Sequence, residues 1–318
     1  MSELNDLLHK YNISKENFKN TQLNWDTLVE IKKDYINIKP DLELAAKHIA
    51  EILHGFDKIH AIRFRLKNTD ALIAKIIRKK IENPNREIGL KNYKEEITDL
   101  IGVRVLHLFK EDWSPIHRFI IDKFEMQDEP IAYFRIGDPD ESIEIFKKND
   151  CKTAEHDRGY RSVHYIVKPP IPKSVCLAEI QARTIYEEAW SEIDHTVSYP
   201  HNLNNTLLGQ FSSVLNRLSG SSDEMGTKIL NLKNELNKYK ETIESLEKKI
   251  KKAKLEPKIK QEVEDKLDSL KRASSSVFFT SNGFTFNSMG SLSTPSATTM
   301  NIPSIKQPNS KSDKRLDL

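Results

Sequence analysis

The chain has few cysteines and no long apolar run, and each shortage excludes a class of protein. Its 318 residues include two cysteines, Cys151 and Cys176, whose spacing gives neither a metal motif nor a disulfide framework. This usage fits a reducing compartment, so we expect a cytoplasmic protein. No run of about 18 apolar residues occurs, and the polar, acidic start lacks the apolar core of a signal peptide. We therefore expect no membrane span and no export signal.

The charges of the chain nearly cancel. Lys and Arg number 50 and Asp and Glu number 47, so the formal net charge is only +3. A nucleic-acid binder with a strong overall field is therefore excluded, and any basic patch must be local. The hydrophobic fraction of 37% is enough for a core in part of the chain and low for all of it. Some of the length must be solvated helix or tail.

The apolar pattern predicts a helical start followed by a sheet domain. Apolar residues recur at helical spacing from Asp41 to Lys80, which predicts a helical N-terminal region over residues 1–60. Residues 61–200 are expected to form an α/β or α+β domain, a mixed central sheet flanked by helices. Short β-branched and aromatic runs predict its strands, at 102–106, 131–134, 162–167 and 175–183. The same patterns predict helices at 113–124 and 185–198.

Residues 201–271 predict helices, and residues 272–318 predict a disordered tail rich in Ser, Thr, Asn and Pro. A helix is expected at about 205–218, and a second, antiparallel one after Pro257. Between them the apolar residues alternate by three and four along a seam: Ile229, Leu232, Leu236, Tyr239, Ile243, Leu246 and Ile250. Such a seam, flanked by Lys and Glu, favours a coiled coil, through which the chain would form a homo-oligomer or pack on itself. A plain solvated helix is the alternative.

A set of basic residues stands at the start of the sheet domain. On a helix running from about Thr69, Lys75 and Arg78 form one stripe, and Arg65 and Lys67 precede it. Arginine offers a bidentate fork and lysine a point charge, which together suit a polyphosphate. Exposed helix faces often carry the same residues, so this set alone leaves a solvated charged face equally open.

Two acidic residues are placed to reach one site from neighbouring strands. If residues 177–183 form a strand, Glu179, Gln181 and Arg183 share one face and the small apolar residues share the other. A half-buried carboxylate between an amide and a guanidinium needs a metal, a ligand or charged partners. Asp99 stands just before another predicted strand, and the pair would hold one Mg²⁺ or deprotonate a ribose hydroxyl. An Asp in that place is also a common turn residue.

Two histidines have open interpretations. His164 lies on a predicted strand, where it is either a functional side chain or a satisfied core residue. His195 lies on the predicted helix 185–198, where it is either a functional side chain or the partner of Glu188 or Glu192, which share its face.

The order of these motifs resembles the RelA/SpoT alarmone-synthetase domain family. These ATP:nucleotide pyrophosphokinases make guanosine penta- and tetraphosphates, and the resemblance implies a nucleotidyltransferase-like fold in a stand-alone, synthetase-only member. It covers about residues 63–199. The elements that carry it are Arg65-Leu66-Lys67, Lys75-Ile76-Ile77-Arg78, Asp99-Leu100-Ile101-Gly102-Val103-Arg104, Gly159-Tyr160-Arg161-Ser162-Val163-His164 and Glu179-Ile180-Gln181-Ala182-Arg183-Thr184.

The resemblance implies a role for each element. Asp99 would bind Mg²⁺, and Glu179 would be a second metal ligand or the catalytic base. The residues implied for ATP are Arg65, Lys67, Lys75, Arg78 and Arg104. Those implied for the acceptor are Tyr160, Arg161, His164, Gln181, Arg183 and His195. Tyr160 would stack on the acceptor guanine, whereas without the resemblance it reads equally as a core tyrosine.

The acceptor side departs from the family pattern. Members that use GDP or GTP carry a Pro-Lys pair and an Asn ahead of Gly-Tyr, and here the segment runs from Cys151 to Arg158 without them. Lys152, Arg158 or Arg161 would have to grip the acceptor phosphates instead. The expected reaction moves diphosphate from ATP to GDP or GTP, while an adenine nucleotide or the 3′ end of tRNA stays open as acceptor. The third alternative is a catalytically inactive protein that senses nucleotides. The pair His156-Asp157 is isolated and does not indicate a hydrolase domain.

Overall fold

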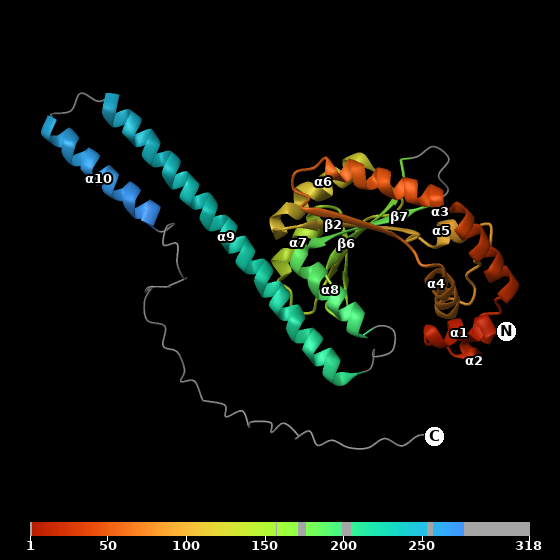
Figure 1. The fold of residues 1–318 in the computed structure, drawn as a ribbon. Coiled ribbons are helices and arrows are strands. Elements are labelled where there is room, and N and C mark those ends of the chain that lie inside the picture. Colours follow the sequence, from red (N-terminus) through yellow and green to blue (C-terminus); the bar gives the residue numbers. More distant parts are fainter. Residues whose placement is uncertain (1, 157, 171–175, 199–204, 253–256, 277–318) are drawn as a thin grey trace, which may run out of the picture. The chain divides into compact units, whose positions relative to one another are not determined.

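The structure is a computed structural model that describes residues 2–156, 158–170, 176–198, 205–252 and 257–276 (Figure 1). These residues divide into two units, of which the first ends at Glu241 and the second begins at Thr242. Each unit is described by itself. No helix in the described ranges combines the length and the apolar content that a bilayer crossing needs.

Three helices open the first unit, α1 (Ser2–Lys10), α2 (Lys15–Asn20) and α3 (Trp25–His54). Helix α3 starts where the side chain of Asn24 accepts a hydrogen bond from the Asp26 amide, and it ends at Gly55. The helical spacing seen from Asp41 to Lys80 does not mean one helical region. Residues Ala61–Leu66 form strand β1, because Ile62, Phe64 and Leu66 alternate with polar residues at the period of a strand.

The centre of the unit is a mixed sheet, as the sequence predicted, and it has seven strands among the described residues. Its strand order is β1-β2-β7-β6-β4-β5, and β3 pairs with β6. The pairs β2–β7 and β4–β5 are parallel and the others are antiparallel. The remaining strands are β2 (Ile101–His107), β3 (Glu125–Met126), β4 (Ile131–Phe134), β5 (Lys152–Glu155), β6 (Ser162–Lys168) and β7 (Ala178–Thr184). Strands β1, β3 and β5 were not predicted.

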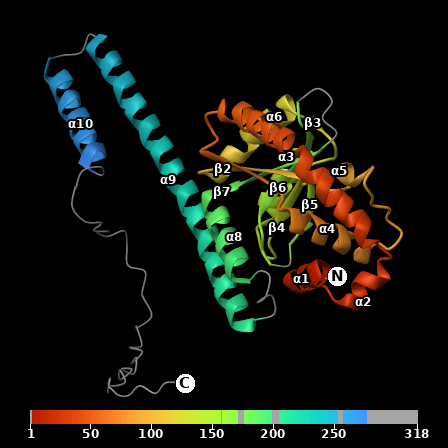
Figure 2. The ribbon, with the colours of Figure 1, turned by 45° about the vertical axis from the view of Figure 1, so that its right-hand side comes forward.

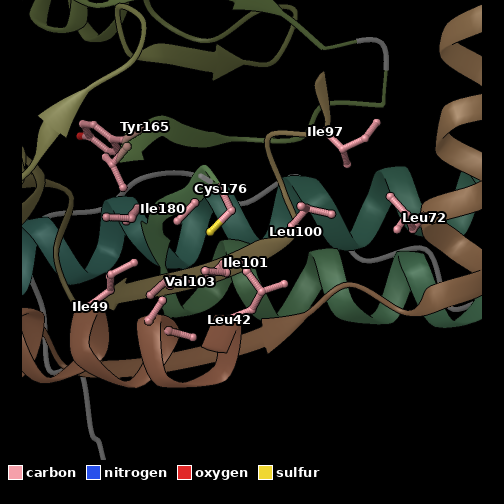
Figure 3. Close-up of a cluster of buried hydrophobic side chains, with 14 of the residues drawn as sticks. Leu42, Ile49, Leu72, Ile97, Leu100, Ile101, Val103, Tyr165, Cys176 and Ile180 are labelled. Carbon is pink, nitrogen blue, oxygen red and sulfur yellow. The ribbon is translucent and has the colours of Figure 1, made fainter. Parts of the chain in front are cut away.

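The two faces of the sheet differ in chemistry. Burial alternates strictly along β2, so that Val103 and its neighbours at spacing two enter the core. There they pack with Ile180 of β7 and with Leu42 and Ile49 of α3 (Figure 3). Helices α3 and α6 (Trp113–Lys123) cover this apolar face, and α8 (Ile185–Ser198) lies on the other side (Figures 1 and 2). The polar face is the one that carries the candidate site.

Other helices connect the strands. They are α4 (Thr69–Glu82), α5 (Tyr93–Glu96), α7 (Asp140–Lys148) and a 3₁₀ turn (Lys110–Asp112). Helices α6 and α8 confirm the predictions at 113–124 and 185–198. Cys151 and Cys176 are both free and buried, which agrees with the expected lack of a disulfide framework.

Helix α9 runs without a break from Thr206 to Lys252. Separate helices at 205–218 and along the seam were therefore the wrong prediction. The weak helix-forming stretch between them is stabilised by contact with the rest of the first unit, where Ser219, Gly220 and Asp223 are buried. Helix α10 (Pro257–Ser276) passes the predicted start of the tail at 272, and residues 277–318 lie outside the described part of the chain.

Candidate active site

Strand β7 has the two-sided character that its sequence predicted. Ala178, Ile180 and Ala182 are buried in the core, and Glu179 and Gln181 are half-buried on the opposite face. The strand register sets Glu179 opposite Gly102 of β2 and Gln181 opposite both Arg104 and His164. Polar side chains from β2, β6 and β7 thus meet on one face of the sheet.

Five residues on this face form a closed ring of contacts, the Tyr160–Arg183 ring. His164 Nε2 lies 3.1 Å from the Tyr160 hydroxyl, and His164 Nδ1 lies 2.9 Å from Glu179 Oε1. Gln181 Nε2 donates to Glu179 Oε2 over 2.9 Å, and Arg183 Nη2 donates to Gln181 Oε1 over 2.6 Å. The Arg183 guanidinium closes the ring 5.0 Å from the centre of the Tyr160 side chain. The predicted acceptor residues on these strands therefore lie together.

Glu179 is held as a carboxylate. Burial acts to raise its pKa, but the hydrogen bond and charge of His164 outweigh burial and keep that pKa below its ordinary value. A carboxylate only accepts, so the His164 nitrogen that faces it, Nδ1, carries a proton. The ring thus holds Glu179 in its charged form.

Asp99 forms the second acidic centre, two residues before β2. Its Oδ2 lies 2.6 Å from Lys67 Nζ and its Oδ1 lies 2.8 Å from Lys75 Nζ. Burial acts to raise the pKa of Asp99, and the two lysines overcome it and hold that pKa below the ordinary value. Burial lowers the pKa of Lys67, and the charge and hydrogen bond of Asp99 act in the opposite direction. The pairing of Asp99 with two of the predicted ATP-binding lysines was not foreseen.

The two acidic centres are close enough to interact. The charge of Asp99 acts to raise the pKa of Glu179, and Lys75 acts to lower it. Two ionised carboxylates from neighbouring strands supply the hard oxygen ligands that Mg²⁺ prefers, with water and phosphate oxygens completing the set. No cluster of three or more His, Cys, Asp or Glu with metal-binding geometry occurs in the described residues. The two carboxylates fit a cation shared with a phosphate substrate.

A third cluster joins the sheet to α8. Arg104 Nη1 contacts Glu188 at 2.8 Å and Glu192 at 2.5 Å, and Arg63 Nη1 lies 3.4 Å from Glu192. Glu188 and Glu192, which the sequence offered as possible partners of His195, both bind arginines of the sheet. His195 is exposed near the end of α8. Arg104 is consequently tied to acidic side chains on the polar face.

Residues 64–204 match the family model described as the region found in RelA / SpoT proteins. The chain carries a RelA/SpoT domain. The GTP pyrophosphokinase YwaC of Bacillus subtilis (strain 168) is 27% identical over 190 residues, which cover 58% of this chain and 79% of that protein. Among solved structures, small alarmone synthetase 1 from Bacillus subtilis is 18% identical with a TM-score of 0.46, covering 65% of this chain and 99% of its own. A GTP pyrophosphokinase family protein from Streptococcus pneumoniae is also 18% identical, with a TM-score of 0.44 and coverage of 74% and 96%.

Two cations of the RelA/SpoT domain make contacts within the protein that the sequence did not predict. Arg78, predicted to lie in one stripe with Lys75, donates from its Nη2 to the Tyr11 carbonyl over 3.0 Å and so contacts the N-terminal region. Arg161, predicted to bind the acceptor, donates from its Nε and Nη2 to the two oxygens of Asp138, over 2.7 and 2.6 Å. The nucleotide roles of both arginines stay predictions.

Other predicted side chains of the RelA/SpoT domain lie at its surface. Arg65 is exposed on β1, in register with Gly102. Lys152 is exposed and pairs with Glu129 at 3.0 Å, and Arg158 lies 3.5 Å from Asp194.

Sequence reasoning missed several residues around Tyr160. Tyr133 of β4 lies 4.8 Å from His164, edge to face, and His156 lies 5.3 Å from Tyr160, both measured between ring centres. The alternation of side chains along β4 predicts which residues share a face with Tyr133. No sequence pattern indicates which strand β4 pairs with. Asn216 of α9 contacts Gly159 from beyond the RelA/SpoT domain, and no local signal predicts a contact over that sequence distance.

A buried acid on α9 predicts a pH-dependent stability. Asp223 accepts a hydrogen bond from Thr184 Oγ1 over 3.0 Å, next to Glu187. Burial first and the charge of Glu187 second raise its pKa from 3.8 to about 7, against the opposing effects of Thr184, Lys110 and Arg161. An acid with a higher pKa in the folded state binds its proton more tightly there. It therefore favours folding at low pH, and that contribution is lost as pH rises from about 4 to about 7.

We expect Asp223→Asn to flatten this dependence. The amide keeps an oxygen for Thr184 and has no charge to lose. The free energy of unfolding of the wild type should fall relative to the variant between pH 5 and pH 8, by at most about 1.4 kcal/mol per pH unit. Denaturant unfolding at each pH measures this, with Glu235→Gln at an exposed site on the same helix as control. Parallel curves for Asp223→Asn and wild type would contradict the assignment.

Proposed function

We propose that this chain is a Mg²⁺-dependent pyrophosphokinase that moves the β,γ-diphosphate of ATP to the 3′-hydroxyl of GDP or GTP. The observation that carries the proposal is the pair of ionised carboxylates, Asp99 and Glu179, beside Lys67 and Lys75 on one face of the sheet. The relationship to the GTP pyrophosphokinase YwaC supports the same class of reaction. Phosphoryl transfer of this kind depends on positioning and electrostatics more than on covalent work by the protein.

The two lysines would bind the phosphates of ATP, the diphosphate donor. Lys67 and Lys75 both contact Asp99. Lys75 is one-third exposed and would turn its ammonium group toward the phosphate oxygens of ATP, whereas Lys67, whose side chain is 14% exposed, would stay beside Asp99. Arg65 would add a planar guanidinium from β1.

Asp99 and Glu179 would hold the metal. The bound Mg²⁺ would neutralise the charge that develops on the transferred phosphates. The lowered pKa of Glu179 favours a metal ligand over a general base, because a base works best with a pKa near the working pH. Glu179 would also accept a hydrogen bond from the 3′-hydroxyl and so orient the nucleophile.

The acceptor base would lie against Tyr160. Arg183 approaches one face of this ring, and His164 ties its hydroxyl to Glu179. A base stacked there would have its ribose directed toward the carboxylates. The connected ring thus links recognition of the acceptor to the position of Glu179.

The proposal is tested by following the label from γ-labelled ATP. The purified full chain is incubated with Mg²⁺ and, in parallel, GDP, GTP, AMP or tRNA, and a duplicate series contains EDTA. We expect label to move to GDP or GTP, and EDTA to abolish the transfer. Label that moves only to AMP or to tRNA would assign a different acceptor, and absence of transfer to all four would overturn the proposed function.

A further inference from the structure

Helix α9 contacts the acceptor segment through one buried asparagine. Asn216 is 3% exposed, and its Nδ2 donates to the carbonyl oxygen of Gly159 over 2.8 Å. Its Oδ1 accepts from Arg135 Nη1 at 3.2 Å and from Arg161 Nη1 at 3.4 Å. One carboxamide from a helix beyond residues 64–204 therefore joins both neighbours of Tyr160.

The backbone before Tyr160 is closely packed at a position that requires glycine. Gly159 has a φ of +73°, in the region that favours glycine. A Cβ at this position would lie 2.9 Å from Arg135 Cγ and 3.3 Å from Asn216 Nδ2. The residue after Tyr160 is fixed as well, because the Arg161 guanidinium binds Asp138 through two nitrogens. Tyr160 is thus carried by a segment held at both ends.

The buried face of α9 is polar although an apolar face was available for packing. It places Asn216, Ser219, Gly220 and Asp223 against the rest of the first unit. The opposite side of the helix exposes large apolar residues, among them Leu207, Phe211, Val214, Leu218 and Met225. Burying polar groups stabilises a fold less than burying apolar ones, and it specifies geometry because each group needs its partner. The polar character of the buried face of α9 therefore favours a positioning role for the contact through Asn216.

We propose that Asn216 is a positioning residue that sets Tyr160 for the acceptor nucleotide, so that α9 completes the acceptor side of the site. This inference rests on the proposed function for its kinetic consequence. Its structural part, that Asn216 fixes the Gly159–Arg161 segment, is independent of catalysis. Asn216 acts through the backbone and the arginines and touches no reacting atom.

Two substitutions separate the contacts of Asn216. Asn216→Ala removes all of them. Asn216→Asp keeps an oxygen for Arg135 and Arg161 but replaces the donor to the Gly159 carbonyl with an acceptor, so it breaks that contact alone. Asn234→Ala is the matched control, because it makes the same change at an exposed position of α9.

Amide hydrogen exchange over residues 158–164 tests the structural part without reference to activity. We expect faster exchange there in both Asn216 variants than in wild type and Asn234→Ala, with an unchanged melting temperature or a small fall. Unchanged exchange in Asn216→Ala would overturn the inference. Faster exchange in Asn216→Ala together with wild-type exchange in Asn216→Asp would also overturn it, since the Gly159 contact would then not be the anchor.

Steady-state titrations with ATP and with GDP test the kinetic part. We expect the KM for GDP to rise about tenfold in both variants while the KM for ATP stays within about twofold of wild type. An equal rise of the KM for both substrates would mean that Asn216 is a purely structural residue and would overturn the positioning role. If the wild type transfers no label to any acceptor, the proposed function fails, and the exchange measurement still decides the anchoring.

Discussion

Replacing Asp99 with asparagine should reduce diphosphate transfer at least about a hundredfold while the fold is retained. The amide has nearly the same shape but lacks the charge that Lys67 and Lys75 contact at 2.6 and 2.8 Å. Glu179→Gln should have an effect of the same size, because it removes the negative charge that His164 stabilises. Transfer of label from ATP measures turnover in both variants.

Each variant needs a test of folding, since both positions are half-buried. A melting curve and the circular dichroism spectrum should stay close to those of the wild type. Asp122→Asn, at an exposed position of α6, is a matched control and should keep full turnover. Wild-type turnover in Asp99→Asn or in Glu179→Gln would remove that carboxylate from the proposed mechanism.

Replacing Tyr160 with alanine should raise the KM for the acceptor about tenfold or more. Stacking of a base on an aromatic side chain is worth roughly 1–3 kcal/mol, and a factor of ten corresponds to about 1.4 kcal/mol. The KM for ATP should change little, because Lys67 and Lys75 lie in a different cluster of the site. Steady-state titration of each substrate measures the two effects separately.

Tyr160→Phe distinguishes the ring from its hydroxyl. Phenylalanine keeps the flat face beside Arg183 and loses the hydrogen bond with His164. If the ring is a stacking platform, this variant should stay within a few-fold of wild type. If Tyr160 only fills the core, Tyr160→Ala should instead lower the melting temperature and impair the use of ATP and of the acceptor equally. That result would exclude a stacking role for Tyr160.

The sequence predicted elements whose pattern is complete within a short segment. Strand β7 is one, because small apolar residues alternate with Glu179, Gln181 and Arg183. Helix α8 is another, since its length and period are unambiguous. Strand β1 was missed because it is only six residues long and has helical patterns on both sides. The alternation of Arg63 and Arg65 with apolar residues is too short to stand out from those patterns.

The partners of charged residues could not be predicted in the same way. Arg78 and Lys75 are one turn apart on α4, yet one contacts Tyr11 and the other Asp99, because helix packing decides which neighbour each side chain meets. Arg161 stands inside a recognisable motif and still binds Asp138, which only the folded chain brings near. Local spacing fixes the face of an element, and the tertiary fold fixes what that face meets.

Strand β1 is the first strand of the sheet order and pairs with β2 alone among the described strands. Such an outer strand offers backbone groups to which a strand of another molecule can add, and charged side chains discourage that addition. Arg63 and Arg65 are the exposed residues of β1. The arginine proposed to attract a nucleotide thus also protects the sheet against aggregation. Loss of activity in an Arg65 variant should be assigned to nucleotide binding only after the variant has been shown to remain dispersed.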